Sequence, residues 1–251
     1  MGSEAAGRGS EAAPFDHPIL LESLARIRRR LGDTGLGGIE QEVLERLVHS
    51  SGDFGLVPAL RFAPGACAAG LAALADGAAI LTDTAMARAA VAPMARRTLG
   101  SAVHSILEWV PGELPAAPSP PAGAGRTRTA AGMEEALRRH PGAVVLIGSA
   151  PTALERLLVL VRQGEAVPPA LVIGMPVGFV GVAESKRHLA ASGLSQIRLE
   201  GSRGGAGLAA AAVNALLRRA WLDQQEITAF SRSELPPADP PRTQGSGQTE
   251  G

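Results

Sequence analysis

Short, mostly apolar runs alternate with longer segments of helical character through most of the chain. A strand that is covered on both faces is apolar throughout, whereas a half-buried strand alternates with polar residues. The pattern therefore predicts a three-layer α/β/α fold with a mostly parallel sheet. The expected strands are Ala79–Thr82, Ala102–Leu107, Ala143–Ile147, Ala170–Ile173 and Gln196–Leu199. The expected helices of this region are Gly65–Asp76, Thr129–His140, Thr152–Gln163, Val182–Ser192 and Gly205–Trp221.

Two more helices are expected before this alternating region. Asp16 is placed to cap the first one, with Pro18 in its first turn and Gly32 at its end. The second begins near Ile39 and carries apolar residues at helical spacing until His49.

The two ends of the chain and one internal segment have little to bury. Disorder is expected in a tail over residues 1–14 and in most of a second tail over residues 223–251, with one domain over residues 15–222 between them. The segment 111–125 contains five prolines and is expected to be a surface loop.

The composition excludes several classes of protein. The chain has 24 basic and 24 acidic side chains, so no overall field favours nucleic acid or a membrane surface. The single cysteine, Cys67, excludes an internal disulfide. No apolar run reaches the roughly 18 residues of a membrane span, and the first 13 residues lack the apolar centre of a signal peptide. A cytoplasmic protein is therefore expected, with no metal site, because one cysteine and scattered histidines cannot form a zinc site of ordinary spacing.

Three strand-to-helix junctions are candidate binding loops. In the longest, residues 173–186, the glycines Gly174, Gly178 and Gly181 leave the backbone bare, so a large flat molecule can approach it. Residues 148–152 (with Ser149 and Thr152) and 201–205 (with Arg203 and Gly205) repeat the arrangement. Open α/β sheets bind ligands at such junctions, and helix N-termini favour anionic groups. Each loop is also consistent with an ordinary turn.

Other candidate residues stand near expected element ends. His49 precedes a polar turn and could donate a proton to a substrate, although a histidine at a helix end more often bonds to terminal carbonyls. Arg128 could bind a carboxylate or be part of a solvated basic turn. Asp83, followed by Met86 and Arg88, could face a cleft, or Asp83 could cap a helix.

Several blocks together resemble the precorrin-8X methylmutase family, also called cobalt-precorrin-8 methylmutase. The blocks run in order from His17 to Ala220 and include V-H-S at 48–50, T-R-T-A-A at 127–131, G-S-A-P-T at 148–152, P-V-G-F-V-G-x-x-E-S-K at 176–186 and R-G-G at 203–205. The resemblance implies a flavodoxin-like fold with a five-stranded parallel sheet. It also implies a methyl migration on ring C of a corrin precursor without a redox cofactor, and a homodimer.

The resemblance also assigns roles to the candidate residues. His49 corresponds to the family histidine that donates a proton or hydrogen bond to the macrocycle, while Arg128 and Arg203 would contact substrate carboxylates. Gly178, Gly181, Ser149, Thr152 and Gly205 would supply backbone or hydroxyl donors. The family usually has Asn where Ser149 stands.

Two other functions are compatible with the sequence. A non-catalytic tetrapyrrole carrier could hand corrinoids to neighbouring pathway enzymes, although His49 argues against it. A nucleotide-dependent enzyme of the doubly wound class is disfavoured, because no Walker loop and no dinucleotide fingerprint is present.

Overall fold

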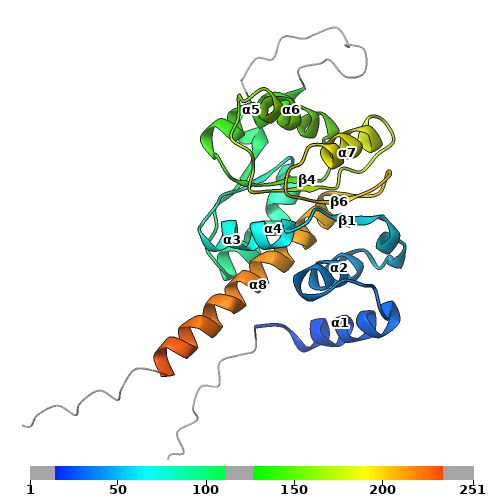
Figure 1. The fold of residues 1–251 in the computed structure, drawn as a ribbon, viewed down its shortest axis with the longest axis vertical. Coiled ribbons are helices and arrows are strands. Elements are labelled where there is room, and N and C mark those ends of the chain that lie inside the picture. Colours follow the sequence, from blue (N-terminus) through cyan, green and yellow to red (C-terminus); the bar gives the residue numbers. More distant parts are fainter. Residues whose placement is uncertain (1–14, 111–126, 234–251) are drawn as a thin grey trace, which may run out of the picture.

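The computed structural model describes residues 15–110 and 127–233, and in this part of the chain six strands form one sheet in the order β1-β6-β5-β4-β2-β3 (Figure 1). The strands are β1 (Leu60–Phe62), β2 (Ile80–Thr82), β3 (Val103–Ser105), β4 (Val144–Ile147), β5 (Leu171–Gly174) and β6 (Gln196–Leu199). All neighbours are parallel except β1, which pairs antiparallel with β6. The α/β class is confirmed, but the expected count of five strands is wrong by the edge strand β1.

Helices cover both faces of this sheet. They are α1 (Pro18–Leu31), α2 (Gly38–Ser51), α3 (Ala66–Ala75), α4 (Ala85–Arg97), α5 (Arg128–Arg139), α6 (Pro151–Arg162), α7 (Val182–Ala191) and α8 (Ala206–Ser233), with short 3-10 turns η1 (Phe54–Ala59) and η2 (Ile106–Trp109). Figure 1 shows α5, α6 and α7 on one side of the strands, α3, α4 and α8 on the other, and α1 and α2 beyond α8.

Alternate residues of each strand enter the two cores that these layers enclose. Val144 and Leu146 of β4 pack with α8 and its neighbours, whereas Val145 and Ile147 pack with α5, α6 and α7. Successive side chains of a strand point to opposite faces, so a sheet covered twice needs apolar residues at every position. This is the physical origin of the apolar runs in the sequence.

The Ala-rich start of α8 lies inside the chain's own core. Ala209, Ala210 and Ala212 are buried among residues of α2, α3 and the sheet. This stretch therefore packs within the chain itself. Helix α8 also ends at Ser233 and not near Trp221, so the tail predicted from residue 223 begins with helix. The last turns of α8 extend beyond the rest of the body (Figure 1).

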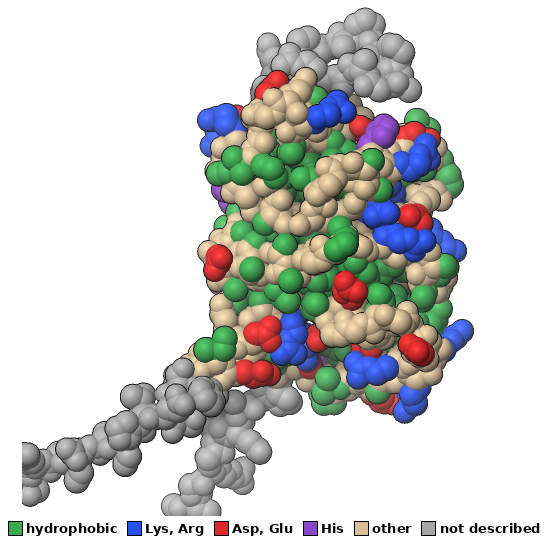
Figure 2. Space-filling model, in the orientation of Figure 1, with side chains coloured by type: hydrophobic (Ala, Val, Ile, Leu, Met, Phe, Trp, Pro, Cys, Tyr) green, Lys and Arg blue, Asp and Glu red, His purple; other side chains and the backbone are tan. Residues whose placement is uncertain are grey.

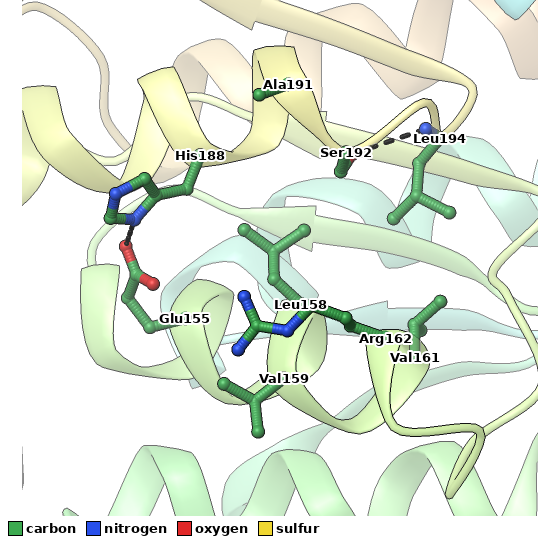
Figure 3. Close-up of a pocket in the computed structure, with 9 residues that line it drawn as sticks. All are labelled: Glu155, Leu158, Val159, Val161, Arg162, His188, Ala191, Ser192 and Leu194. Carbon is green, nitrogen blue, oxygen red and sulfur yellow. Dashed lines mark hydrogen bonds and ion pairs between the residues drawn. The ribbon is translucent and has the colours of Figure 1, made fainter.

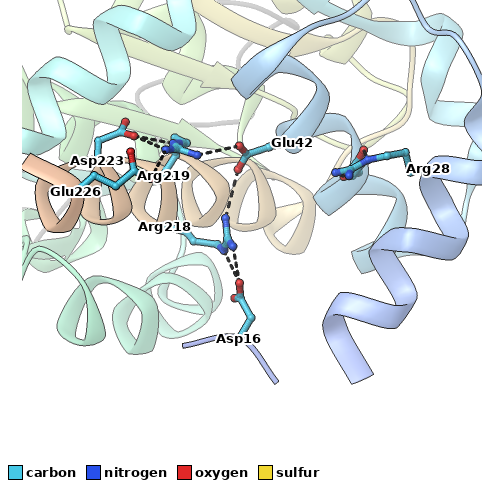
Figure 4. Close-up of polar contacts among 8 residues, drawn as sticks. Asp16, Arg28, Glu42, Arg218, Arg219, Asp223 and Glu226 are labelled. Carbon is cyan, nitrogen blue, oxygen red and sulfur yellow. Dashed lines mark hydrogen bonds and ion pairs between the residues drawn. The ribbon is translucent and has the colours of Figure 1, made fainter. Parts of the chain in front are cut away.

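Ion pairs fix α1 and α2 to α8. Arg218 of α8 donates from Nε to Asp16 at 2.8 Å and lies 3.4 Å from Glu42 of α2 (Figure 4). Asp16 was expected to cap α1, and this is wrong, because His17 is the N-cap residue and its Nδ1 accepts from the Ile19 amide.

The remaining differences concern short segments. The sequence did not predict α4, and the strand expected over Ala102–Leu107 is shortened to β3 by the turn η2. The Pro-rich loop 111–125 and the end segments 1–14 and 234–251 lie outside the described residues. Over residues 15–110 and 127–233, no helix combines the length and the apolar character that a bilayer crossing requires.

Candidate active site

The three predicted junctions meet at the edge of the sheet where the parallel strands end. The amide of Met175 donates to Ile147, and that of Val177 to Gly148, which joins the loops after β5 and β4. The amide of Gly178 donates to Ser202 at 3.1 Å, and that of Gly205 to Met175 at 2.8 Å, which joins the loops after β5 and β6. The three loops therefore form one continuous surface.

Glycine is required where these loops touch. A Cβ on Gly204 would lie 2.0 Å from the carbonyl oxygen of Met175, and one on Gly148 would lie 2.6 Å from the backbone of Ala206. Neither contact can be relieved by rotating a side chain, because both involve backbone atoms. The amides of Gly178 and Gly205 already have backbone acceptors, so these two residues shape the surface and do not present free donors, in contrast to the expectation from sequence.

Asp83 organises the turn after β4. Its buried carboxylate accepts three backbone amides at a single oxygen, Oδ2: Gly148 at 3.0 Å, Ser149 at 2.6 Å and Ala150 at 2.8 Å. Burial raises the pKa of Asp83, and the three amide hydrogen bonds oppose that shift. Asp83 does not cap a helix, since the hydroxyl of Thr84 accepts the amide of Ala87 at the start of α4. Asp83 therefore contacts Ser149, although the two residues are 66 positions apart in the sequence.

Two helix N-termini lie side by side next to this turn. The hydroxyl of Thr152, in the first turn of α6, is 2.9 Å from that of Thr127 and 3.2 Å from that of Thr129 at the start of α5. Arg128 is the first residue of α5, is exposed, and has no side-chain partner among the described residues. The helix ends, the hydroxyls and the exposed guanidinium make this region suitable for binding a carboxylate.

His49 and Arg203 lie at the other side of the same edge. Arg203 is 3.3 Å from Asp53, and a Cβ on Gly55 would lie 2.6 Å from its Nη1, so the segment after α2 packs on the loop after β6. His49 precedes Asp53 by four residues, in the last turn of α2, and is exposed. Its Nδ1 is 2.8 Å from the hydroxyl of Ser23 on α1.

Two further candidates are placed less centrally. Met86, in the first turn of α4, is 66% exposed. Arg88 donates from Nε to the carbonyl oxygen of Val103 at 3.1 Å and pairs with Glu108 at 3.4 Å. It therefore links α4 to the first residue of β3 and to the turn η2, and is occupied by protein groups.

Lys186 was not among the candidate residues predicted from the sequence, although it belongs to the E-S-K motif. Its ammonium group donates to the carbonyl oxygens of Gly201 at 2.9 Å and Arg203 at 2.6 Å, and only 2% of the residue is exposed. Burial lowers the pKa of Lys186 to about 8. The sequence did contain an indication that Lys186 is buried. It lies four residues after Val182 and three before Leu189, on the same helix face as these two buried side chains.

A groove of about 650 Å³ lies elsewhere, between α6 and α7 (Figure 3). His188 and Glu155 form a 2.7 Å ion pair at one end, and Arg162, Ser192 and Leu194 line the other. The groove follows the two helices away from their N-termini, so it leads away from the junction loops. Basic and acidic side chains are interspersed over the face in Figure 2, in agreement with the zero net charge.

Comparison with known proteins identifies relatives that span this whole fold. The precorrin-8X methylmutase family matches residues 18–219. The chain is 38% identical over 222 residues to the cobalt-precorrin-8 methylmutase of Synechocystis, covering 83% of this chain and 98% of that protein. It is 43% identical over 200 residues to the precorrin-8X methylmutase of Pseudomonas aeruginosa, covering 79% and 93%.

A solved structure agrees with these matches. The precorrin-8X methylmutase of Thermus thermophilus superimposes with a TM-score of 0.71 at 37% identity, covering 83% of this chain and 99% of the other. Sequence and fold therefore lead to the same conclusion: the chain belongs to the precorrin-8X methylmutase family, isomerases of cobalamin biosynthesis.

Proposed function

We propose that the protein moves a methyl group within ring C of precorrin-8X, or of its cobalt-containing counterpart, to give hydrogenobyrinate or cobyrinate. The observation that carries this proposal is the meeting of three glycine-rich junctions at one sheet edge in a chain of this family, with His49 at the adjoining end of α2. The methyl group stays within one molecule, so the atoms balance without a second substrate, and a redox cofactor is not needed.

His49 is the proposed acid. Donation from the hydroxyl of Ser23 to Nδ1, across 2.8 Å, would leave the proton on Nε2. Nε2–H could then donate to the conjugated macrocycle and polarise it, and general acid catalysis of this kind typically contributes about a hundredfold or more. In this arrangement Ser23 is a positioning residue, since it acts only through the tautomer of His49.

The substrate carboxylates are proposed to bind on both sides of this edge. Arg128 and the neighbouring hydroxyl of Thr152 lie on the α5 and α6 side, and Arg203 lies on the α2 side. The ion pair of Arg203 with Asp53 is about half exposed, so it is weak, and a substrate carboxylate can replace it. The Ser149 hydroxyl is a further proposed donor.

A homodimer in the cytoplasm, with hand-off of the corrinoid to neighbouring pathway enzymes, completes the proposal. Sedimentation of the purified protein would test the dimer, whose mass would be twice the 25.6 kDa of the chain.

The test is the absorption spectrum of precorrin-8X incubated with wild type and with His49→Ala. We expect wild type alone to produce the hydrogenobyrinate spectrum, while the variant binds without conversion. Full activity of His49→Ala would remove His49 from the mechanism. Binding without conversion by both proteins would favour a carrier or a requirement for the cobalt form, and Ser149 in place of the family Asn is the feature that motivates this alternative.

A further inference from the structure

We propose that the tip of the loop after β5, formed by Val177, Phe179 and Val180, is the apolar surface on which the tetrapyrrole macrocycle lies. This inference rests on the proposed function. The side chains are 49%, 95% and 78% exposed, so an aromatic ring and two branched side chains face water at the edge that carries the candidate site. Most large apolar side chains of a folded domain are covered, and a cluster of exposed ones marks a contact surface.

The base of this tip is fixed. Val177 donates its amide to Gly148, Gly178 donates to Ser202, and Gly181 accepts the amide of Ser185 in the first turn of α7. Gly178 and Gly181 have φ angles of 142° and 70°, which favour glycine and direct the chain outward between them. The tip is therefore held away from the body by its anchored ends, and Phe179 does not fold back onto the core.

The position of the tip matches a flat ligand with an apolar centre and an anionic rim. Strands β5, β4 and β2 are neighbours, so the tip and Met86, which follows β2, flank the turn after β4. Strands β5 and β2 lie two strand spacings of about 4.8 Å apart, and the resulting distance of about 10 Å suits the width of a macrocycle. Arg128 and Arg203 stand towards the two ends of this edge, where peripheral carboxylates would lie.

A protein partner is less compatible with the same surface. Three side chains are far fewer than the roughly 20 residues a side of a stable interface. Other large exposed apolar residues belong to different elements, such as Ile19 on α1 and Val167 after α6, and do not extend the tip along the chain. The ligand that the tip fits best is therefore the tetrapyrrole itself.

The test compares the dissociation constant of hydrogenobyrinate, followed by its absorption, and the steady-state kinetics with precorrin-8X. For Phe179→Ala we expect the dissociation constant and KM to rise about tenfold with kcat unchanged, because the ring is buried against substrate and transition state alike. Phe179→Leu should keep most of the affinity. The matched control is Ile19→Ala, which removes a side chain of 71% exposure from α1 and should leave both constants unchanged.

The outcomes separate this inference from the proposed function. If wild type binds and converts the tetrapyrrole and Phe179→Ala does so equally well, the tip is not the macrocycle surface, while the proposed function stands. If Phe179→Ala changes the sedimentation coefficient, the tip docks onto a second copy of the chain, and the inference fails. If wild type neither binds nor converts, both ideas are wrong.

Discussion

At the scale of one residue, Lys186 shows how a buried charged group can hold a loop in place. Its ammonium group holds two carbonyl oxygens of the loop that carries Arg203, although burial lowers its pKa from 10.5 to about 8. Burying an ammonium group is unfavourable unless hydrogen bonds compensate for lost hydration. The carbonyls of Gly201 and Arg203 supply this compensation, so Lys186 links α7 to the candidate site.

The lowered pKa of Lys186 predicts an unusual dependence of stability on pH. The folded protein releases this proton at about pH 8, whereas the unfolded chain keeps it to about pH 10.5. Between these values the unfolded state binds more protons, so the contribution of Lys186 to the free energy of unfolding rises with pH. Relative to Lys186→Met, we expect wild type to gain about 2 kcal/mol between pH 7 and pH 10, measured by urea unfolding.

The composition excludes other lysine and tyrosine side chains from titrating in this pH range. Lys186 is the only lysine, and the chain has no tyrosine. Cys67, whose pKa burial raises to about 12, acts in the opposite direction but is present in both proteins and cancels. A difference between wild type and Lys186→Met that is constant from pH 7 to pH 10 would contradict the lowered pKa.

At the scale of the elements, the sequence predicts an element reliably when the element is long enough and its apolar residues recur in a regular pattern. Four-residue strands such as β4 and β5 are apolar throughout, and their carboxyl ends meet at one edge by the geometry of parallel sheets, so the meeting of the three loops was predictable. Strand β1 has three residues, including the exposed Arg61, and gives no pattern. Helix α4 contains Pro93, which normally indicates a helix end.

Contacts between distant elements could not be predicted from such patterns. Asp83 caps the turn of Gly148 to Ala150 instead of its own helix, and nothing local distinguishes the two uses of a carboxylate. The occupied amides of Gly178 and Gly205 likewise depend on where other loops lie. Sequence identifies the loops of the site, while the fold decides which of their groups remain free.

The packing of α1 on α2 gives a prediction at this scale. Arg28 of α1 donates from Nε and Nη2 to the two carboxylate oxygens of Glu45, both at 2.7 Å, and the Glu45 side chain is only 1% exposed. Arg28→Ala would leave a buried carboxylate without its cation. We expect the free energy of unfolding to fall by about 2–3 kcal/mol in urea at pH 7, below the range for fully buried pairs because Arg28 itself is largely exposed.

The same helix provides the matched control. Arg26 pairs with Glu22 on the surface, with both side chains more than 60% exposed. Arg26→Ala should lower the free energy of unfolding by less than about 0.5 kcal/mol. Equal losses in the two variants would mean that burial of Glu45 does not govern the α1–α2 contact.

At the scale of the whole molecule, α8 connects nearly all layers. Its N-terminal part lies in the core against α2, α3 and the sheet, and Arg218 and Arg219 near its middle bind Asp16, Glu42 and Asp223 (Figure 4). The helix also begins at Ala206, directly after the loop of Arg203 and Gly205. Stability of the fold and placement of the candidate site therefore depend on the same element.

This dependence predicts where the chain can be shortened. A variant of residues 15–233 retains both cores, the polar network of α8 and all the junction loops. We expect its melting temperature to stay within about 2 °C and its kcat/KM within about twofold of wild type.

A variant of residues 15–222 ends at the boundary that the sequence suggested and loses Asp223, which accepts a hydrogen bond from the Nε of Arg219 at 2.8 Å. Its melting temperature should fall by about 2–4 °C in calorimetry, because Arg219 then lacks the carboxylates of Asp223 and Glu226 with which it pairs, a loss of about 1 kcal/mol. Equal melting temperatures would place the end of the folded unit at residue 222, and a loss of kcat/KM in the 15–233 variant at unchanged melting temperature would assign a functional role to the end segments.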